Sequence, residues 1–309
     1  MTGYELREMV PADRLAVADL ICLSTNCWYQ AHGHSLIFAD GPVTTELHFD
    51  LYQTLEGSSG LVVEDTRSGA IIGSCFQHIR PTHVSLGIMN VHPNHFGRGV
   101  ARTLLNAIID TAKREGKPLR LVSSAMNLDS YSLYTRAGFV PRHAYQDMFL
   151  AVPEDGLDAC VPNLHLVRPA TPADVPAMAA VELAVSGIRR DSDYRHFIEN
   201  PDGIWHVSVF ESVPGRLEGF LVSCGHSGVN MIGPGVMCED EVTAALLFTE
   251  LNQHRGRTPV FLLPVERNEL VRQVYSWGGR NCEMHFSQVL GDFTPFQGIN
   301  MPTFLPETG

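Results

Sequence analysis

The sequence lacks the features of a membrane, secreted or nucleic-acid-binding protein. Its 309 residues contain no run near the roughly 18 apolar residues of a membrane helix, and the opening MTGYELREMV has no secretory signal. Cations are scarce, with 22 Lys and Arg against 34 Asp and Glu, whereas phosphate backbones are bound by clustered cations. We therefore expect a cytoplasmic globular protein with no membrane or nucleic-acid partner. Its formal charge of -12 suits a cationic small molecule better.

Disulfide and metal-binding spacings are also missing. The seven cysteines are scattered, odd in number and never spaced C-x-x-C, which is typical of reduced thiols in a core. His32 and His34, and likewise His92 and His95, have no third or fourth ligand at a usable spacing. We therefore predict neither a disulfide framework nor a metal site.

Two stretches of the sequence recur in the same order. The first begins LREMVPAD at Leu6 and recurs as LVRPATPAD at Leu166, with Arg, Pro, Ala and Asp at a constant offset of 161 residues. The second places an Asn seven residues before a Tyr and a Gly four residues after that Tyr, once from Asn127 and again from Asn268. Two recurrences in one order indicate an internal duplication.

The duplication divides the chain into a first domain over residues 1–152, a linker over 153–164 and a second domain over 165–309. In the first domain, hydrophobic periodicity and turn residues predict helices among strands. The predicted strands are residues 4–9, 60–66, 70–80, 83–92, 119–124 and 139–150, and the predicted helices are 12–26, 44–56, 99–115 and 129–137. This order predicts a mixed α/β fold, in which helices flank a central, mostly antiparallel sheet.

A glycine-bearing loop joins a strand to a long helix in VHPNHFGRGVARTLL, residues 91–105. The free N–H groups and the dipole of a helix start favour an anion, and Gly97 and Gly99 let the backbone approach a phosphate. Arg98 places a cation between them, although a tight turn without a ligand fits the same residues. Two other phosphate loops are excluded, since no Gly-Lys-Ser/Thr follows and no third glycine completes a dinucleotide fingerprint.

Two motifs in this region resemble one known family. The spacing V-x-P-x-x-x-G-x-G-x-A occurs at Val91, Pro93, Gly97, Gly99 and Ala101. It is followed by N-x-x-x-x-x-x-Y-x-x-x-G-F from Asn127 to Phe139, and the pair resembles the GNAT superfamily of acyl-CoA N-acyltransferases. The resemblance implies two tandem GNAT folds, acetyl-CoA as the donor, and a primary amine of a small molecule or a protein as the acceptor. It also implies direct attack of the amine in a ternary complex.

The resemblance assigns roles to individual residues. Backbone groups of Asn90 and Val91 would pair with the pantetheine arm like an added strand, and the loop from Asn94 to Val100 would hold the pyrophosphate. The full set implied for the coenzyme is Asn90, Val91, Asn94, Phe96, Gly97, Arg98, Gly99, Val100, Ala101, Asn127 and Tyr131. Tyr134 is the implied catalytic residue, facing the thioester sulfur, although a tyrosine there can also simply pack its helix. Relatives usually have Arg or Gln where Asn94 stands, which weakens one implied contact to the pyrophosphate.

The group that accepts the proton of the amine is not identified by the sequence. The predicted strand 83–92 has no carboxylate where many GNAT relatives place one. Its polar candidates are His83, Ser85, Asn90 and His92, with Ser123 and Ser124 on the next strand. His92 is the titratable group nearest the loop, but a histidine at a strand end is more often structural. We favour a chain of water molecules.

The second domain has lost the loop of the first. The corresponding stretch from Val236 is shorter, has no Gly-x-Gly, and places Glu239, Asp240 and Glu241 at a helix start, where they suit the dipole and repel phosphate. We predict a degenerate GNAT domain that shapes the substrate cleft or is structural. A non-catalytic CoA-binding or sensor protein is the alternative function, and we expect a monomer or a homodimer.

The sequence ends in LPETG, residues 305–309, which matches a sortase sorting signal. Genuine sorting needs a membrane segment and a basic tail after the motif, so we interpret the match as coincidental. The Gly- and Pro-rich stretch from Asp292 is expected to form an ordered tail on a surface.

Overall fold

The computed structural model describes residues 3–307, which form two compact units. Unit 1 consists of residues 3–121 together with 304–307, and unit 2 consists of residues 122–303. The division differs from the boundary at 153–164 that the duplication predicts, because the last part of the first sequence repeat packs within unit 2. Each unit is described by itself below.

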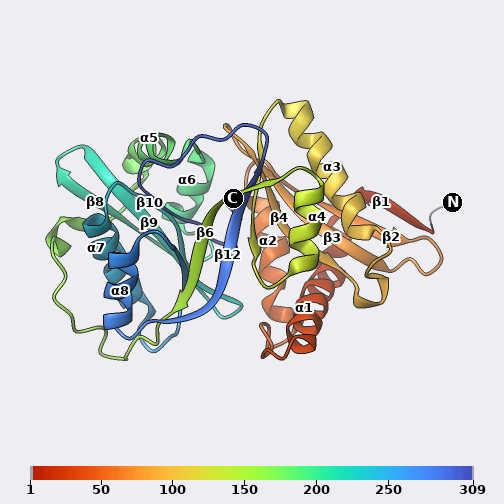
Figure 1. Ribbon diagram of the computed structural model, residues 1–309, viewed down its shortest axis with the longest axis horizontal. Coiled ribbons are helices and arrows are strands. Elements are labelled where there is room, and N and C mark those ends of the chain that lie inside the picture. Colours follow the sequence, from red (N-terminus) through yellow and green to blue (C-terminus); the bar gives the residue numbers. More distant parts are fainter. Residues whose placement is uncertain (1–2, 308–309) are drawn as a thin grey trace. The chain divides into compact units, whose positions relative to one another are not determined.

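Unit 1 contains the first strands and helices of the chain (Figure 1). Its elements are β1 (Tyr4–Glu8), α1 (Arg14–Ala31), α2 (Glu46–Thr54), β2 (Ser58–Asp65), β3 (Ile71–Ile79), β4 (Val84–Val91), α3 (Val100–Glu115) and β5 (Leu119–Ser124), the last of which runs on into unit 2. The predicted elements are confirmed, with α1 extending five residues beyond its predicted end at residue 26.

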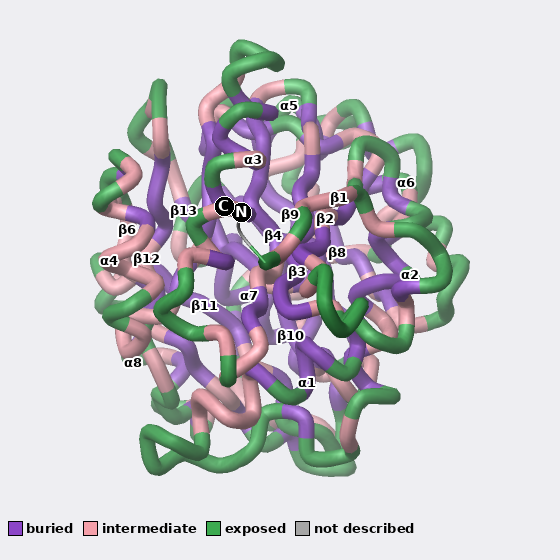
Figure 2. The backbone as a smooth tube through the Cα atoms, turned by 90° about the vertical axis from the view of Figure 1, so that its right-hand side faces the viewer, coloured by how far each residue is buried: buried purple, intermediate pink, exposed green. Residues whose placement is uncertain are grey.

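The sheet of unit 1 has the order β1-β2-β3-β4-β5. Neighbours are antiparallel except β4 and β5, which are parallel and pair only at Val84 with Leu119 and Ser85 with Arg120. Helices α1 and α2 cover one face of the sheet and α3 covers the other, and β3 is buried along most of its length (Figure 2). The α3 stripe that includes Leu104 and Ile108 fits the prediction from hydrophobic spacing.

Unit 2 begins within β5 and contains the remaining elements. These are α4 (Leu128–Arg136), β6 (Val140–Phe149), β7 (Val167–Pro169), α5 (Val175–Ser186), α6 (Asp191–Glu199), β8 (Trp205–Val213), β9 (Arg216–His226), β10 (Val229–Met237), α7 (Asp240–Leu251), β11 (Val260–Pro264), α8 (Asn268–Ser276), β12 (Arg280–Leu290) and β13 (Ile299–Met301). Its core includes the buried face of α7 and the inner residues of β10 and β11.

Strand β6 explains where the two units divide. In the sheet of unit 2, with order β12-β6-β11-β10-β9-β8-β7, β6 lies between β12 and β11 and pairs antiparallel with both. The strand ends the first sequence repeat, yet both of its neighbours come from the second. Backbone hydrogen bonds on two edges therefore fix β6 in unit 2, a long-range pairing that local sequence patterns do not encode.

The cysteines are all free, but they are not all in the core. Cys22, Cys75 and Cys224 are buried, whereas Cys160, Cys238 and Cys282 are exposed. The expectation of core thiols is therefore wrong for the last three. Within residues 3–307, no helix is long and apolar enough to cross a membrane.

Candidate functional site

The loop after β4 has the backbone geometry of an anion site. A short 3-10 turn, Pro93–His95, follows the strand, and Gly97 and Gly99 have φ of +73° and +87°. Gly99 is the N-cap of α3, so the first N–H groups of this 16-residue helix have no acceptor within the helix. The His92 ring accepts a hydrogen bond from the Asn94 N–H at 3.2 Å, which gives this histidine a structural role in the turn.

The residues of this loop fit a pyrophosphate. Asn94, Phe96 and Arg98 are exposed, and a Cβ at position 97 would meet nothing within 4 Å, so the loop has open space around it. At position 99 a Cβ would come within 3.3 Å of the Arg102 guanidinium. Helix N–H groups, a positive dipole end and the Arg98 cation together provide what a phosphate needs. Val100 and Ala101 form the first turn behind the loop.

The edge of β4 that faces β5 is largely unpaired. After Val84 and Ser85, no further residue of β4 pairs with β5 among the described residues. Among residues 3–307, the backbone of Asn90 and Val91 pairs only on the other edge, where these residues oppose Ser74 and Gly73 of β3. An extended ligand can add to such an edge as a strand does, which is the contact that the resemblance implies for the pantetheine arm.

A bulge in β4 sets which side chains share a face. Cys75 opposes Met89 and Gln77 opposes Leu86, so β4 has one extra residue opposite Phe76. Opposed residues point to the same face of a sheet. The bulge therefore places Gly87 and Asn90, although three residues apart, both on the face covered by α1 and α2.

Asn90 is buried on this face and is only partly hydrogen-bonded. Its amide donates to Ser24 Oγ at 2.7 Å and to Thr25 Oγ1 at 3.3 Å, both on α1. Its Oδ1 has no partner among the described residues. A buried amide oxygen without a donor is costly, so Asn90 offers one acceptor to a ligand on the face covered by α1 and α2.

A buried carboxylate that no sequence pattern reveals lies on the same face. Glu307, from the chain end in unit 1, accepts hydrogen bonds through Oε2 from the Tyr52 hydroxyl at 2.6 Å and from His78 Nε2 at 3.1 Å. Burial raises the pKa of Glu307, but the bonds from His78 and Tyr52 outweigh it and lower that pKa below its ordinary value. The expected ordered tail lies on a surface only in its first part, where Asp292 and Thr294 are exposed, whereas Leu305 is 1% exposed and lies in a core. Residues 308 and 309 of the LPETG match lie outside the described residues.

The other predicted residues lie on α4, in unit 2. Asn127 caps this helix, since its side chain accepts a hydrogen bond from the Ser130 N–H at 3.0 Å. Tyr134 is buried, with its ring centroid 5.8 Å from that of Phe139, while the half-buried Tyr131 lies 5.8 Å from Phe286. Their roles toward a coenzyme stay predictions, and the capping and packing contacts show what each residue contributes to the fold.

The first sequence recurrence gives matching structures in the two units. In unit 1 Arg7 donates two hydrogen bonds to Asp13, at 2.7 and 2.9 Å, and in unit 2 Arg168 donates two to Asp174, at 2.9 and 2.8 Å. In each unit the Nε of the arginine also bonds a glutamate of a neighbouring strand. Three identical contacts at each site support the duplication.

The second recurrence is shifted by one residue in the structure. Helices α4 and α8 have nine residues each, and α8 starts at Asn268, whereas Asn127 precedes α4 as its cap. Matching the helix ends places Arg267 opposite Asn127. The expected match of Asn127 with Asn268 is therefore wrong, because helix caps, rather than sequence identity, fix the register.

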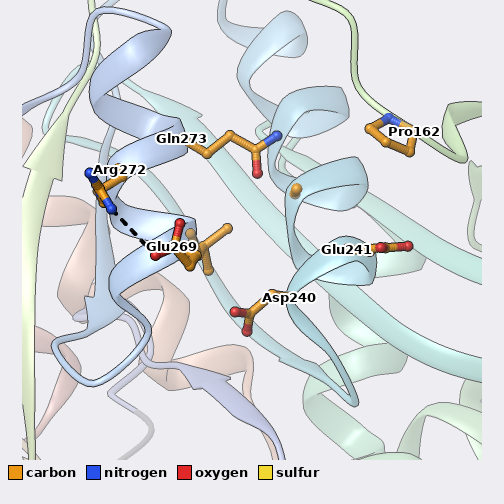
Figure 3. Close-up of a pocket in the computed structure, with 8 residues that line it drawn as sticks. Pro162, Asp240, Glu241, Glu269, Arg272 and Gln273 are labelled. Carbon is orange, nitrogen blue, oxygen red and sulfur yellow. Dashed lines mark hydrogen bonds and ion pairs between the residues drawn. The ribbon is translucent and has the colours of Figure 1, made fainter.

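A pocket in unit 2 lies where α7 begins beside α8 (Figure 3). Asp240, Glu241 and Glu269 line it, and Arg272 is 3.4 Å from Glu269. Helix α7 is capped by Glu239 and has both acids in its first turn, as predicted. Three carboxylates against one arginine disfavour a phosphate, which supports the prediction that the second repeat has no coenzyme site.

A polar cluster lies where β6 and β12 pair. Asp147 Oδ2 is 2.9 Å from His285 Nδ1, and Glu283 accepts a short hydrogen bond from Ser124. One ligand atom from each of Asp147, Glu283 and His285 lies within 4.8 Å of the others, and these residue types are ones that divalent cations use. Burial raises the pKa of the Asp147 carboxyl. Sequence spacing could not find this cluster, because it joins two strands that are distant in the chain.

Comparison with known proteins agrees with this geometry. Residues 24–139 match the model of the acetyltransferase (GNAT) family. No curated protein matches the sequence.

Solved structures resemble the whole chain at low identity. A Pyrococcus horikoshii protein whose suggested activity is acetyltransfer has a TM-score of 0.73 and 15% identity over 99% of this chain and 96% of its own. A GCN5-related N-acetyltransferase from Sphaerobacter thermophilus has a TM-score of 0.62 and 14% identity over 96% of this chain and 99% of its own. A tandem GNAT protein of the clavulanic acid biosynthesis pathway has a TM-score of 0.60 and 16% identity over 94% of this chain and 100% of its own.

The matched segment contains β4, the glycine loop, α3 and α4, and the structural likeness extends over both repeats. Residues 24–139 therefore resemble the acetyltransferase (GNAT) family, and the chain as a whole has the fold of a tandem GNAT protein.

Proposed function

We propose that this protein is an acetyl-CoA-dependent N-acetyltransferase that acts on a primary amine. The observation that carries the proposal is the unpaired edge of β4 leading directly into a glycine loop that caps α3. The strand edge suits the pantetheine arm and the helix start suits the pyrophosphate. The match of residues 24–139 to the acetyltransferase (GNAT) family model supports the same donor.

Acetyl transfer requires a neutral amine. An alkylamine with a pKa of about 10.4 is mostly protonated at pH 7, and removing the proton costs about 4.6 kcal/mol. The amine nitrogen then attacks the thioester carbon, a C–N bond forms and the C–S bond breaks. Of the two protons lost by the ammonium, one ends on the sulfur and the other is released to solvent.

Tyr134 is the proposed residue for the leaving thiolate. A phenol with a pKa near 10 is a weaker acid than a thiol near 8.5, so complete proton donation is uphill by about 2 kcal/mol. A hydrogen bond to the developing thiolate needs no such transfer and stabilises the transition state where charge accumulates. We therefore assign Tyr134 a stabilising role.

A CoA-binding sensor without catalysis is the second candidate function. The observation in its favour is that β4 itself supplies no carboxylate near the unpaired edge. The two functions differ in turnover but share coenzyme binding, so they are separated only by an assay with amines.

The first experiment is isothermal titration of the full chain with acetyl-CoA. We expect one site per chain, lost in Gly99→Glu, which adds a carboxylate at the helix start. Gly116→Glu is the control for backbone strain, because Gly116 also has a positive φ, of +63°, but lies at the other end of α3. Equal loss in both variants would point to backbone strain and remove the assignment of the loop.

A screen for thiol release with primary amines follows. Turnover with any amine supports the transferase, while one bound acetyl-CoA without turnover across polyamines, amino sugars and lysine peptides favours the sensor. Absence of acetyl-CoA binding would overturn both functions.

A further inference from the structure

The strand that lacks a carboxylate receives one from the end of the chain. Gly87 lies on the bulge of β4, and a Cβ at this position would come within 3.0 Å of Glu307 Oε2 and 3.1 Å of His78 Nε2. The absence of a Cβ at Gly87 lets the carboxylate lie against the strand without this crowding. Glu307 therefore lies on the face of β4 that α1 and α2 cover. On the same face, Asn90 presents an Oδ1 that has no partner among the described residues.

The surroundings of Glu307 hold it as an anion. Tyr52 and His78 both donate to Oε2, and Ser58 Oγ lies 2.7 Å from the other ring nitrogen of His78, which fixes the ring. Neither of these bonds involves Oε1. The Glu307 side chain is 10% exposed. A buried carboxylate with one oxygen fixed and the other outside both bonds can receive a cation.

We infer that Glu307 binds the ammonium group of the acceptor amine at the β4 bulge, so that the acceptors of this protein are cationic. The inference rests on the proposed N-acetyltransferase function and names its substrate class. The site is made of Gly87, which leaves the space, Tyr52 and His78, which orient the carboxylate, and Glu307, which contacts the substrate.

Glu307 is an anchor rather than the final proton acceptor. Its lowered pKa lies below 4.5, and an alkylammonium has a pKa of about 10.4, so full transfer of the proton to this carboxylate is steeply uphill. A carboxylate that stays ionised instead attracts the protonated amine and keeps it close to the strand. The proton leaves through water, as proposed from the sequence.

The test compares amines of different charge. Glu307→Gln keeps the shape and the ability to accept from Tyr52 and His78 but removes the charge. Glu5→Gln is the matched control, because Glu5 is an exposed residue of the edge strand β1, separated from β4 by β2 and β3. The probes are polyamines and amino-acid esters, which are cationic at pH 7.5, and weakly basic aryl amines, which are neutral.

For cationic amines we expect Glu307→Gln to raise KM at least tenfold, with KM for aryl amines and the Kd of acetyl-CoA within twofold of the wild type. Glu5→Gln should change none of these. An unchanged KM for cationic amines in Glu307→Gln, or an equal rise for both amine classes, would overturn the inference while leaving the transferase intact. The unchanged Kd of acetyl-CoA and a cooperative thermal unfolding transition establish that the variant is folded.

If the wild-type protein binds acetyl-CoA but acetylates no amine, the proposed transferase function is wrong. The inference about Glu307 is then tested by measuring amine binding. The same amines are titrated into the protein saturated with CoA. Binding of cationic amines that is lost in Glu307→Gln supports the anchor. No binding of any cationic amine by the wild type overturns it.

Discussion

Tyr134 of α4 and Val274 of α8 hold the same place in their helices. The carbonyl of each accepts the N–H groups three and five residues later, at 3.0 and 3.1 Å for Tyr134 and at 3.1 and 3.0 Å for Val274. Both side chains are buried. Of these two equivalent positions, only the one in the first repeat has a hydroxyl. In the second repeat a valine fills the same buried position. This contrast motivates the first prediction, that the Tyr134 hydroxyl acts in catalysis.

We expect Tyr134→Phe to lower kcat about 100-fold while the Kd of acetyl-CoA stays within twofold, because the hydroxyl acts on the thiolate that forms only during reaction. Tyr275→Phe on α8 is the control, because this tyrosine is exposed and lies in the second repeat, and it should retain most of the turnover. Steady-state kinetics with a reactive amine and titration with acetyl-CoA measure the two quantities. Equal kcat for Tyr134→Phe and the wild type would leave Tyr134 with a packing role only.

The pair of Arg168 and Asp174 predicts an acid-dependent contribution to stability. Hydrogen bonds from Arg168 lower the pKa of Asp174 from 3.8 to about 2. A depressed pKa stabilises the fold above pH 3.8, and the stabilisation disappears as the pH falls through 2. Since Arg168 is 37% exposed, we expect Asp174→Asn to cost only about 1 kcal/mol at pH 7.

Urea unfolding of Asp174→Asn and the wild type between pH 3 and pH 7 checks this prediction. The difference in free energy of unfolding should shrink as the pH falls. A difference that stays constant with pH would mean that the aspartate contributes by packing and not through its charge.

His206 predicts the opposite dependence on pH. Its Nδ1 is 2.9 Å from Glu250 Oε1, and Glu250 is fully buried. The hydrogen bond with Glu250 raises the pKa of His206 above 6.5. A raised pKa stabilises the fold below pH 6.5, and this stabilisation is lost as the pH rises through the folded value.

We therefore expect His206→Gln to lower the free energy of unfolding by about 1 kcal/mol at pH 6 and by much less at pH 9. Urea unfolding at the two values of pH provides the comparison. His254, whose pKa burial lowers to about 4, is neutral at both and provides a control position. A larger loss at pH 9 than at pH 6 would show that His206 is not stabilised in its charged form.

The hydrogen bond between Tyr52 and Glu307 is expected to stabilise the fold. Its hydroxyl donates to the ionised Glu307, and hydrogen bonds to charged groups contribute about 1.5 to 3 kcal/mol. Tyr52→Phe should lower the free energy of unfolding by this amount in chemical denaturation. Tyr4→Phe is the control, because its hydroxyl has only a 3.4 Å contact with Thr103, and it should cost less than about 1 kcal/mol. Equal effects of the two substitutions would argue against a specific bond to Glu307.

The sequence by itself determined the order of helices and strands in the first repeat, the glycine loop and the duplication. Each of these depends on local rules. Hydrophobic spacing identifies α3, and the positive φ of the loop favours glycine at positions 97 and 99. The turn before α1 is recognisable because Arg7 bonds Asp13, only six residues away. Such features are readable because the interacting residues are close in the chain.

Only the tertiary structure decided the rest. The place of β6 between β11 and β12, and the contact of Glu307 with Tyr52, 255 residues away, depend on pairings that no local pattern specifies. The one-residue shift between α4 and α8 depends on where helix caps form, which overrode a sequence identity at Asn268. Long-range backbone pairing and burial thus placed a carboxylate against β4, a strand whose own sequence has none.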